Sequence, residues 1–382
     1  MKKIIFAAPL YFTSPTKLGG HQYAEQFNKH GWEVFYFSNP LTPFNILLDR
    51  GNPDLPERLR IYKSGGVDCN GIKSYVPFTL VPHHNIFFFN NQFFLNNYYR
   101  FTAPSLKSVV KKFGIGEVDI LWMDCNNQLF WADILKYKKL AYRIPDNILG
   151  FKQKSPATIA AHYKIMDKAD LILMTSKILL NKLELKYRKK AIYCPNGVDL
   201  SRFCAETYTF PEEYRKLPNT PIGLYVGTID DWFDFEVLKL VAENLPAVSF
   251  VIIGPRKVAA TLSFPSNVHF FGKRDYSLIP SFIRYCTFGI IPFKNNDLVK
   301  YVNPIKMYEF FSLGKPVVST CWEELEMSGA PVNLADSPIE FINMIKTVLR
   351  DMKESDLNLV EYAKANTWEN RYNYILKNLG YQ

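Results

Sequence analysis

Two charged side chains spaced three residues apart, Lys306 and Glu309, are the strongest candidates for chemistry in this sequence. They fall in a segment that reads as a short helix, and this spacing places them on one face of it. An ammonium group in a first helical turn adds to the free backbone N–H groups in holding a diphosphate. The Glu309 carboxylate can accept two ribose hydroxyls, so the pair suits a nucleotide. The alternative is a solvated pair on a surface helix.

The neighbouring sequence supplies the elements that position this pair. Residues 288–292 form an apolar run that predicts a buried strand, and residues 316–320 predict a second, β-branched one. Between them, Asn303 is expected as N-cap and Pro304 as first helical residue, because that position needs no N–H donor. Gly314 is expected just beyond the helix end. The resulting βαβ unit offers the usual place for a phosphorylated ligand, after the first strand's carboxyl end.

The motif that starts at Asn303, Asn-Pro-x-Lys-x-Tyr-Glu-(x)4-Gly-Lys-Pro-Val-Val, resembles the donor-site motif of GT-B fold glycosyltransferases. The similarity is to the family 4 type and its relatives, including the xanthan-type glucuronosyltransferases, and it covers nearly the whole chain. It implies a donor site for a nucleotide sugar that includes Asn303, Lys306, Met307 and Glu309. In those enzymes the carboxylate at the Glu309 position binds the ribose of the nucleotide.

Composition narrows the class of protein. A chain of 382 residues fits two domains that each bury a core, and 48% hydrophobic and 15% aromatic residues argue against disorder. The net charge of +10 favours an anionic partner: nucleic acid, acidic lipid head groups or a phosphorylated substrate. No nucleic acid partner is expected, because the positive charge is dispersed and no nucleic-acid-binding fold signature is present.

Cysteine usage and hydropathy point to the cytoplasm. The six cysteines are scattered without a Cys-x-x-Cys pair, which argues against a zinc site and a disulfide framework. No run approaches the roughly 18 apolar residues that span a bilayer. The apolar start of the chain reads as a first strand rather than a signal peptide, because the run is short and breaks at Pro9.

The stretch 75–113 interleaves aromatic residues with histidines and basic residues. They are Phe78, His83, His84, Phe87, Phe88, Phe89, Phe93, Phe94, Tyr98, Tyr99, Arg100, Phe101, Lys107, Lys111 and Lys112. Such a pattern suits an anionic membrane surface or single-stranded nucleic acid. An aromatic core segment followed by a solvated basic helix is the alternative. We prefer the membrane, since an amphipathic surface on an acceptor domain suits a lipid-linked acceptor. The expected location is cytoplasmic and peripheral on the inner face of the cell membrane.

The first 38 residues predict a strand, a glycine loop, a helix and a second strand, which is the start of a Rossmann-like domain. Gly19 and Gly20 let the backbone approach a ligand closely, although a tight turn is the common alternative. The pair resembles the glycine loop that lies over the interdomain cleft in GT-B enzymes. His21 is a candidate contact for donor phosphate or acceptor, with a surface or capping role as the alternative.

Two predicted strands end in an acidic residue, Asp124 and Asp146. A carboxylate at a strand's carboxyl end faces the ligand crevice, where a general base must lie. Asp146 is the preferred base, because Tyr-Arg-Ile-Pro-Asp-Asn at 142–147 resembles the Tyr-Arg-x-x-Asp-Asp segment of related enzymes. Capping of the next helix is the alternative role for Asp146.

Later motifs complete a GT-B outline of two Rossmann-like, doubly wound α/β domains facing an interdomain cleft. The expected divisions are an acceptor-binding domain over 1–204, a linker over 205–220, a nucleotide-sugar-binding domain over 221–362 and a C-terminal helix over 363–382 that crosses back. Pro-Asn-Gly-Val-Asp at 195–199 resembles the motif that closes the first domain of family 4 enzymes. In the second domain, Gly227 and Thr228 are expected near the phosphates. The resemblance places Lys273 beside the nucleotide base.

Two departures from the family pattern bear on mechanism. Retaining family 4 enzymes carry a glutamate where this chain has Tyr301. They also carry an arginine and a lysine after the Gly227 position, whereas here Thr228 is followed by Asp230, Asp231 and Asp234. Neutralisation of the negative charge of the diphosphate is then left largely to Lys306 and to helix ends. An inverting reaction with Asp146 as the base is favoured. No metal or other cofactor is expected, since no Asp-x-Asp stands at a strand end.

The predicted function is transfer of a sugar to a hydroxyl of a glycan or lipid-linked oligosaccharide in cell-surface polysaccharide synthesis, and the resemblance favours a UDP-linked sugar as donor. Two alternatives stay open: a catalytically idle GT-B partner that binds glycan or membrane, and a GT-B sugar-nucleotide epimerase.

Overall fold

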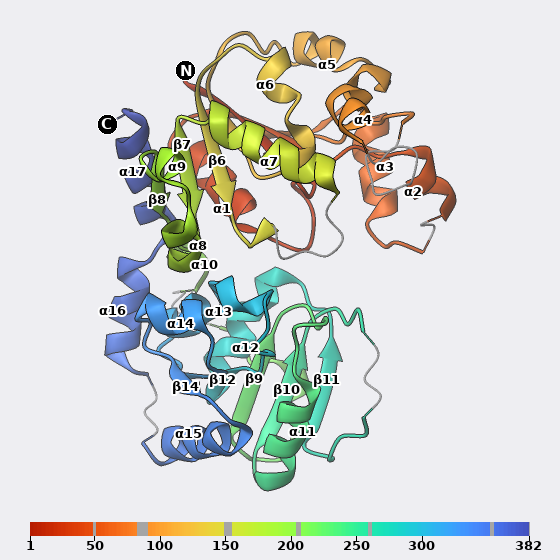
Figure 1. Cartoon of the computed structure of the whole chain (residues 1–382). Coiled ribbons are helices and arrows are strands. Elements are labelled where there is room, and N and C mark those ends of the chain that lie inside the picture. The colour runs from red at the N-terminus through yellow and green to blue at the C-terminus, as the bar shows by residue number, and fades with distance from the viewer. Residues whose placement is uncertain are drawn as a thin grey trace. The chain divides into compact units, whose positions relative to one another are not determined.

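The computed structural model describes residues 1–48, 51–81, 91–148, 155–203, 208–258, 262–351 and 355–381. Contacts divide the chain into two compact units (Figure 1). The first comprises Met1–Thr175, Leu179–Cys194 and Tyr372–Gln382, and the second comprises Ser176–Ile178 and Pro195–Arg371. Each unit contains its own mainly parallel sheet, as the sequence predicts for two Rossmann-like domains.

The sheet of the first unit has the strand order β3-β4-β2-β1-β5-β6-β7-β8 among the described residues. Its strands are β1 Lys3–Ala8, β2 Glu33–Ser38, β3 Val67–Cys69, β4 Ile72–Tyr75, β5 Val118–Met123, β6 Tyr137–Ile144, β7 Leu171–Met174 and β8 Ala191–Tyr193. All pairs are parallel except β3 with β4. The order reverses direction between β1 and β5, which is where ligands of doubly wound sheets bind.

The sheet of the second unit has the order β11-β10-β9-β12-β13-β14 and is parallel throughout its described pairs. Its strands are β9 Ile222–Val226, β10 Ser249–Ile253, β11 Val268–Gly272, β12 Phe288–Ile291, β13 Val317–Thr320 and β14 Asn333–Ala335. The reversal lies between β9 and β12. The expected strand, loop, helix and strand around Lys306 is therefore present as β12, α13 and β13.

Helices connect the strands of both sheets (Figure 1). In the first unit they are α1 Gly19–Lys29, α2 Pro43–Leu48, α3 Leu55–Lys63, α4 Gln92–Asn97, α5 Leu106–Lys112, α6 Trp131–Ile134, α7 Pro156–Lys168 and α9 Leu185–Arg188, with α8 Lys177–Lys182 shared. The second unit has α10 Leu200–Phe203, α11 Phe235–Asn244, α12 Ile279–Tyr285, α13 Ile305–Ser312, α14 Glu323–Ser328, α15 Pro338–Arg350 and α16 Leu357–Ala365, and α17 Trp368–Leu379 begins there. No described helix combines the length and apolar character needed to cross a bilayer.

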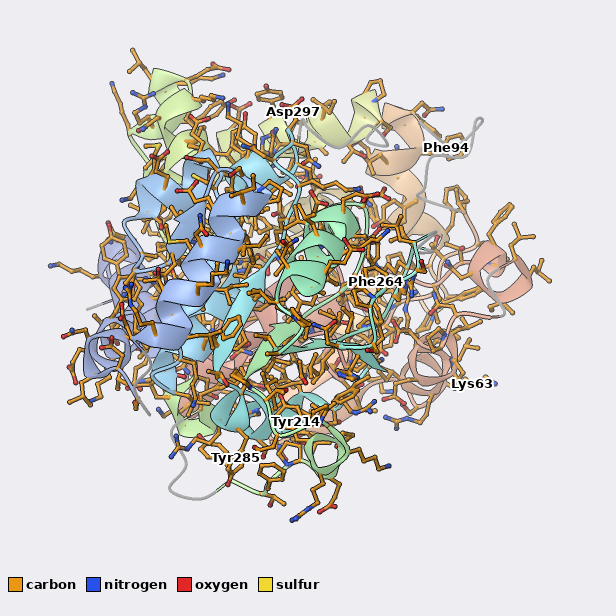
Figure 2. The ribbon with its side chains drawn as sticks, turned by 90° about the horizontal axis from the view of Figure 1, so that it is seen from below. Lys63, Phe94, Tyr214, Phe264, Tyr285 and Asp297 are labelled. Carbon is orange, nitrogen blue, oxygen red and sulfur yellow. The ribbon has the colours of Figure 1, made fainter. Side chains whose placement is uncertain are left out.

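The segment expected to be a linker is instead part of the second unit's packing. Within its described part, Glu212–Lys216 forms a 3-10 helix and Tyr214 is buried. The hydroxyl of Tyr214 donates to the carbonyl of Phe282 at 3.1 Å. Tyr214 and Tyr285 lie near each other in Figure 2, and the ring of Phe210 contacts both. These aromatic side chains give the segment apolar surface to bury, which its Pro, Glu and Lys content concealed.

The boundary residues also differ from the expected divisions. Pro195–Phe203, placed by the sequence with the first domain, pack with the second unit. From Tyr372 onward, helix α17 packs with the first unit, where Trp32 Nε1 donates to the Tyr372 hydroxyl at 3.1 Å. The ring of His30 stacks on that of Tyr372 with centroids 4.3 Å apart. The C-terminal crossing therefore takes place inside one helix.

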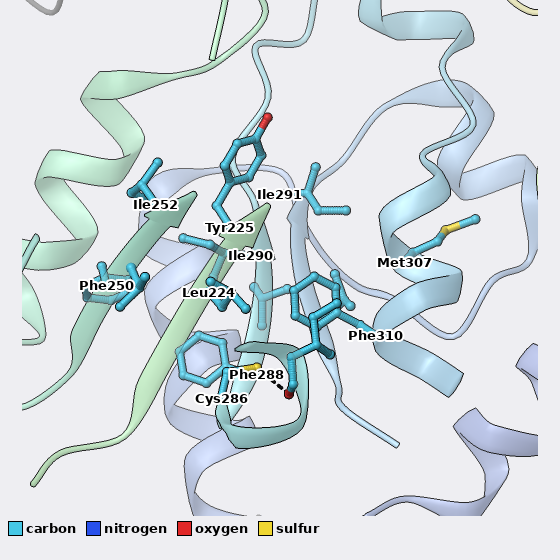
Figure 3. Packing of buried hydrophobic residues seen from close by; sticks show 14 of the residues in the cluster. Leu224, Tyr225, Phe250, Ile252, Cys286, Phe288, Ile290, Ile291, Met307 and Phe310 are labelled. Atoms are coloured by element: carbon cyan, nitrogen blue, oxygen red, sulfur yellow. Dashed lines mark hydrogen bonds between the residues drawn. The ribbon is translucent and has the colours of Figure 1, made fainter. Parts of the chain in front are cut away.

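Glycines in two strands allow close packing in the second unit, of α13 on β12 at Gly289 and of a β12 side chain on β9 at Gly223. A Cβ on Gly289 of β12 would lie 2.9 Å from the ring of Phe310, and one on Gly223 of β9 would lie 2.9 Å from the ring of Phe288. Figure 3 shows these two phenylalanines in the buried cluster. The helix that carries Lys306 and Glu309 is thus held against the strand that precedes it.

Helix α13 ends where the sequence predicts, at Gly314. Leu313 is the C-cap and Gly314 has a φ of 65°. The N–H of Gly314 bonds to the carbonyl of Phe311 at 2.9 Å, and the N–H of Lys315 bonds to that of Phe310 at 3.0 Å. This is the Schellman arrangement, which satisfies carbonyls that the helix end leaves open.

Gly314→Ala should destabilise the protein more than Gly329→Ala. Both glycines have positive φ, 65° and 69°. A Cβ on Gly314 would lie 2.0 Å from Ser355 Oγ and 2.8 Å from the N of Asp356, whereas one on Gly329 has nothing within 4 Å. We expect losses of about 2–4 kcal/mol and about 1–2 kcal/mol in urea unfolding. Equal losses would contradict the close packing of residues 355–356 on this helix end.

Candidate functional site

The start of α13 is built differently from the expected cap. Pro304 is the N-cap, with extended backbone at φ −77° and ψ 121°, and Ile305 is the first helical residue. Asn303 instead holds a neighbouring turn: its Oδ1 accepts from the N–H of Asn196 at 3.0 Å, and its carbonyl accepts from Asn196 Nδ2 at 2.7 Å. The prediction of Asn303 as N-cap is wrong by one residue, because its side chain is committed to this tertiary pairing.

The Pro-Asn-Gly-Val-Asp turn is packed tightly between two other segments of the second unit. Asn196 bonds to Asn303, as described, and Val198 exchanges backbone hydrogen bonds with Asn366 and Trp368 at 3.1 Å each. A Cβ on Gly197 would lie 2.9 Å from the carbonyl oxygen of Asn366. The motif therefore anchors the approach to α13, which agrees with the mainly structural role expected for it.

Lys306 and Gly227 are brought together at the carboxyl ends of β9 and β12. A Cβ on Gly227, whose φ is 155°, would lie 2.2 Å from Lys306 Cε and 2.8 Å from its Nζ. The ammonium group thus lies over the backbone of a glycine turn. Burial lowers the pKa of Lys306, while the nearby Glu309 carboxylate opposes that shift. A desolvated cation at this edge is well placed for a phosphate.

The Gly227 turn is supported by the next strand. Its N–H donates to the carbonyl of Ile253 at 2.8 Å, and a Cβ on Gly254 would lie 1.8 Å from the Gly227 oxygen. Thr228 is half-buried, and its carbonyl accepts hydrogen bonds from the Tyr225 hydroxyl at 2.8 Å and Trp232 Nε1 at 3.2 Å. Beyond β11, Lys273 is exposed.

Glu309 is buried, with 4% of its surface exposed. The hydroxyl of Tyr276 donates to Glu309 Oε1 at 2.5 Å. The guanidinium of Arg202 lies over the Tyr276 ring, 5.0 Å from its centroid, and also forms a 3.6 Å ion pair with Asp199. Burial raises the pKa of the Glu309 carboxyl, while Tyr276, Lys306 and Arg202 counteract that rise.

Tyr276 and Arg202 are parts of this site that sequence reasoning missed. Arg202 follows the Pro-Asn-Gly-Val-Asp motif by three residues, which was the available local signal. Tyr276 lies in a 3-10 turn after β11, far from Glu309 in sequence, and has no local signal at all. Met307, expected at the donor site, has a fully buried side chain in the hydrophobic cluster (Figure 3), so that side chain packs the helix instead.

The acidic residues after Gly227 have structural partners. Asp234 is the N-cap of α11 and accepts from the N–H groups of Glu236 and Val237 at 3.1 and 3.0 Å. Asp230 accepts from the N–H of Asp231 at 2.9 Å and pairs with Lys257 at 3.7 Å. Within the described part of the chain, no three His, Cys, Asp or Glu side chains gather as metal ligands do.

In the first unit, the Gly19-Gly20 pair lies against a buried ion pair. Arg143 Nη1 is 3.8 Å from Asp124 Oδ1, and both side chains are buried. A Cβ on Gly19 would lie 2.3 Å from Arg143 Nη2, and one on Gly20 would lie 2.1 Å from Asp124 Oδ2. The glycines begin helix α1, so here they make room for charged side chains of the protein itself.

His21 has a structural role rather than the expected ligand contact. It is fully buried, with its Nδ1 accepting from the N–H of Leu18 at 3.1 Å and its Nε2 3.1 Å from the carbonyl of Tyr11. Burial lowers the pKa of His21 to about 4, so the ring is neutral. Both ring nitrogens are therefore occupied by backbone groups.

Asp146 and Asp124 lie in different environments. Asp124 is committed to Arg143 and accepts from Trp122 Nε1 at 3.1 Å. Asp146 is half-buried after β6 and lines a cavity of about 140 Å³ in the first unit. Helix α7, which begins at Pro156, has Ser155 as its N-cap. Of the two strand-end acids, Asp146 is the one beside open space.

Two doubly wound units in one chain are typical of the GT-B fold, and comparisons with known proteins agree. Residues 6–175 match the family model described as the N-terminal domain of glucuronosyltransferase GumK. The expected resemblance to GT-B glycosyltransferases of the glucuronosyltransferase type is thereby confirmed.

Individual relatives are more distant. The chain is 27% identical over 240 residues to TuaH, a teichuronic acid biosynthesis glycosyltransferase of Bacillus subtilis (strain 168), and the match spans 58% of this chain and 60% of that relative. Sucrose-phosphate synthase of Thermosynechococcus elongatus superposes with a TM-score of 0.70 at 14% identity, covering 99% of this chain and 98% of that one. HepE of Anabaena in complex with UDP-glucose superposes with a TM-score of 0.66 at 15% identity, covering 100% of both.

Glu309→Gln should stabilise the ligand-free protein at pH 7, with a gain that shrinks as the pH falls. Burial raises the pKa of Glu309 above its ordinary 4.5, so the folded state holds the proton more tightly than the unfolded state. The resulting stability is present below about pH 4.5 and is lost as the pH rises through the folded pKa. Glutamine carries no such cost and keeps an oxygen for Tyr276. Urea unfolding across this range measures the difference, and a pH-independent difference would contradict it.

Proposed function

We propose that this protein is a glycosyltransferase that transfers a sugar from a nucleoside diphosphate donor, with UDP preferred, to a hydroxyl of a glycan or lipid-linked oligosaccharide. The process it would serve is cell-surface polysaccharide synthesis. The second unit binds the donor, and the first unit binds the acceptor and supplies the base. The reaction is inverting and needs no metal or other cofactor.

The observation that carries the proposal is the convergence of Lys306, Gly227 and Glu309 at one edge of the second sheet. The Lys306 ammonium lies over the Gly227 turn, at the first turn of α13, where free N–H groups add positive potential. Glu309 lies on the same helix, one turn further on. A diphosphate at the helix start therefore leaves the adjoining ribose hydroxyls within reach of a carboxylate. The Lys306 cation matches the diphosphate of a nucleoside diphosphate, and the Glu309 carboxylate matches the hydroxyls of its ribose.

The relatives support a donor of this kind. HepE, which shares the fold over its whole length, is described in complex with UDP and with UDP-glucose. TuaH is described as a glycosyltransferase of teichuronic acid biosynthesis. These relatives make a UDP-sugar the first donor to test.

The mechanism follows from the positions of charge. The acceptor hydroxyl attacks the anomeric carbon from the face opposite the diphosphate, and its proton passes to the Asp146 carboxylate. The bond to the diphosphate breaks as the new bond forms, which inverts the configuration. Charge that develops on the leaving diphosphate is stabilised by Lys306 and by the N–H groups of the first turn of α13. The absence of a glutamate at the Tyr301 position agrees with an inverting course.

Glu309→Ala and Lys306→Ala should separate the two halves of the donor site. In calorimetric titrations, we expect Glu309→Ala to weaken UDP about 10- to 100-fold through lost hydrogen bonds to a charged group. It should weaken uridine similarly, because it acts at the ribose. Lys306→Ala should weaken UDP by a similar factor and leave uridine unchanged, since it acts at the diphosphate.

Asp146→Asn is the matched control, because it should abolish transfer while leaving UDP affinity unchanged. If the wild type binds no nucleotide, the transferase and epimerase functions both fail and an idle GT-B partner of glycan or membrane becomes the better hypothesis. Conversion of a nucleotide sugar without any acceptor would favour the epimerase.

We further propose that residues 75–113 place the protein on an anionic membrane surface, peripherally on the cytoplasmic face. The described part of this stretch divides between core and surface, so the core interpretation holds for Tyr75 and Tyr98, which are buried. Leu80, Phe93 and Phe101 are 61%, 65% and 43% exposed. His83, His84, Phe87, Phe88 and Phe89 lie outside the described residues.

The exposed apolar residues have basic neighbours in the chain. The N–H of Leu80 donates to the carbonyl of Phe101 at 3.0 Å, so these two residues are adjacent. Arg100, Lys107 and Lys111 are exposed close by in sequence. Apolar side chains that enter the head-group region and cations that attract anionic lipids act together at membrane surfaces.

The triple variant Leu80→Ser, Phe93→Ser and Phe101→Ser should lose most of its binding to phosphatidylglycerol vesicles in a sedimentation assay. Leu357→Ser, at a residue of the second unit that is 75% exposed, is the control and should bind like the wild type. Binding of the wild type should fall with added salt, because the attraction is partly electrostatic. Equal binding of both variants would rule out this surface.

A further inference from the structure

The two oxygens of the Glu309 carboxylate are not equally open to a ligand. The hydroxyl of Tyr276 donates to Oε1 at 2.5 Å. The other oxygen, Oε2, has no hydrogen-bond partner among the described residues, yet it is not sealed from solvent. Only 4% of the surface of Glu309 is exposed, so the carboxylate is approached over a small area. Oε2 is therefore the carboxylate oxygen that is open to a ligand.

The Tyr276 hydroxyl is a second acceptor beside Oε2. A ribose has two vicinal hydroxyl groups, and each needs an acceptor when the sugar leaves water. A phenol hydroxyl has one proton to donate and also has lone pairs that accept. Tyr276 uses its proton on Glu309, and no residue in the described part of the chain donates to its oxygen. One carboxylate oxygen and one phenol oxygen thus lie side by side, each ready to accept.

The Tyr276 side chain is fixed by its neighbours rather than free to swing aside. The guanidinium of Arg202 lies over its ring, 5.0 Å from the centroid, and the buried ring of Phe203 contacts it edge-on at a centroid distance of 6.0 Å. Its backbone lies in the 3-10 turn after β11, where Asp275 accepts from the N–H of Ser277 at 2.8 Å. A group that is ordered before binding loses little entropy when the ligand arrives.

The protonation of Tyr276 agrees with an accepting role toward a ligand. Burial and the neighbouring Glu309 carboxylate raise the pKa of Tyr276 well above its ordinary 10.0, so the phenol keeps its proton. That proton is directed at Glu309. What the hydroxyl has left for a ligand is its lone pairs, which suit a hydroxyl of the ligand as donor.

We propose that Tyr276 is a second binding residue for the ribose, so that Glu309 Oε2 accepts one of the vicinal hydroxyls and the Tyr276 oxygen accepts the other. This inference rests on the proposed function, because it takes the ribose to lie at Glu309. It differs from the expectation that the Glu309 carboxylate accepts both hydroxyls by itself. Tyr276 is then a specificity residue, which selects ribonucleotides over deoxyribonucleotides.

The test pairs the hydroxyl of Tyr276 with each hydroxyl of the ribose. Wild type and Tyr276→Phe are titrated calorimetrically with UDP, 2′-deoxy-UDP and 3′-deoxy-UDP. We expect the wild type to bind each deoxy nucleotide about 3- to 10-fold more weakly than UDP, the usual effect of one lost hydrogen bond. Tyr276→Phe should bind UDP weaker by a similar factor and should no longer distinguish UDP from one of the two deoxy nucleotides. It should keep its preference over the other, because Glu309 Oε2 still accepts that hydroxyl.

The design contains two controls. Both proteins meet the same three ligands, so an effect of the missing hydroxyl on the sugar ring itself cancels in the comparison. Tyr285→Phe is the matched variant, because it also removes a tyrosine hydroxyl of the second unit (Figure 2), one that donates to the carbonyl of Tyr208 at 2.7 Å. It should bind all three nucleotides like the wild type, and urea unfolding of both variants checks that they are folded.

Three results would overturn the role of Tyr276. Equal affinity of the wild type for all three nucleotides, which needs no variant, would mean that the ribose hydroxyls are not read. The same loss for all three in Tyr276→Phe would mean that Tyr276 only holds Glu309 in place. Tighter binding of UDP by Tyr276→Phe would mean that its hydroxyl occupies the place of the ribose. A wild type that binds no UDP overturns the proposed function instead, so the two failures are distinguishable.

Discussion

The second unit depends on the hydrogen bond and the charges that surround one buried carboxylate, that of Glu309. Burial raises the pKa of the Glu309 carboxyl, and a protonated acid is a poorer acceptor for hydroxyl groups. Three groups from different parts of the unit oppose this: the Tyr276 hydroxyl, the Lys306 ammonium and the Arg202 guanidinium. Tyr276 lies in the 3-10 turn after β11, Arg202 in α10 and Lys306 in α13, so the packing of these three segments stabilises the Glu309 carboxylate.

Glycine makes that support possible by leaving space. Lys306 reaches the strand ends only because Gly227 has no side chain there, and Gly227 is itself held against Gly254. The first unit has the same feature, because Gly19 and Gly20 leave room for the buried ion pair of Arg143 and Asp124. In both units a charged side chain lies where a Cβ would otherwise be. Larger residues at these glycines would displace the charge as well as strain the backbone.

Local sequence patterns predicted the strands and helices well, but they predicted the tertiary contacts of individual side chains less well. The strands around α13 and its end at Gly314 follow from hydrophobic runs and glycine chemistry, which act over a few residues. The N-cap failed because Asn303 bonds to Asn196, more than a hundred residues away. The side chains of His21 and Met307 are buried, which the sequence did not predict, because it does not show which face of a helix the core covers. The linker was misread because its polar composition outweighed its few aromatic residues.

The sequence by itself determined the class of fold and the two residues on which the donor site is proposed, because strand runs, helix ends and the Lys306–Glu309 spacing are all local. It also reduced the candidate bases to Asp124 and Asp146. Only the tertiary structure decided between their environments, by burying Asp124 with Arg143 and leaving Asp146 beside a cavity. Tyr276 likewise emerges only from the folded chain. Burial and partnership depend on residues distant in sequence, and these two factors decide the charge and the availability of a side chain.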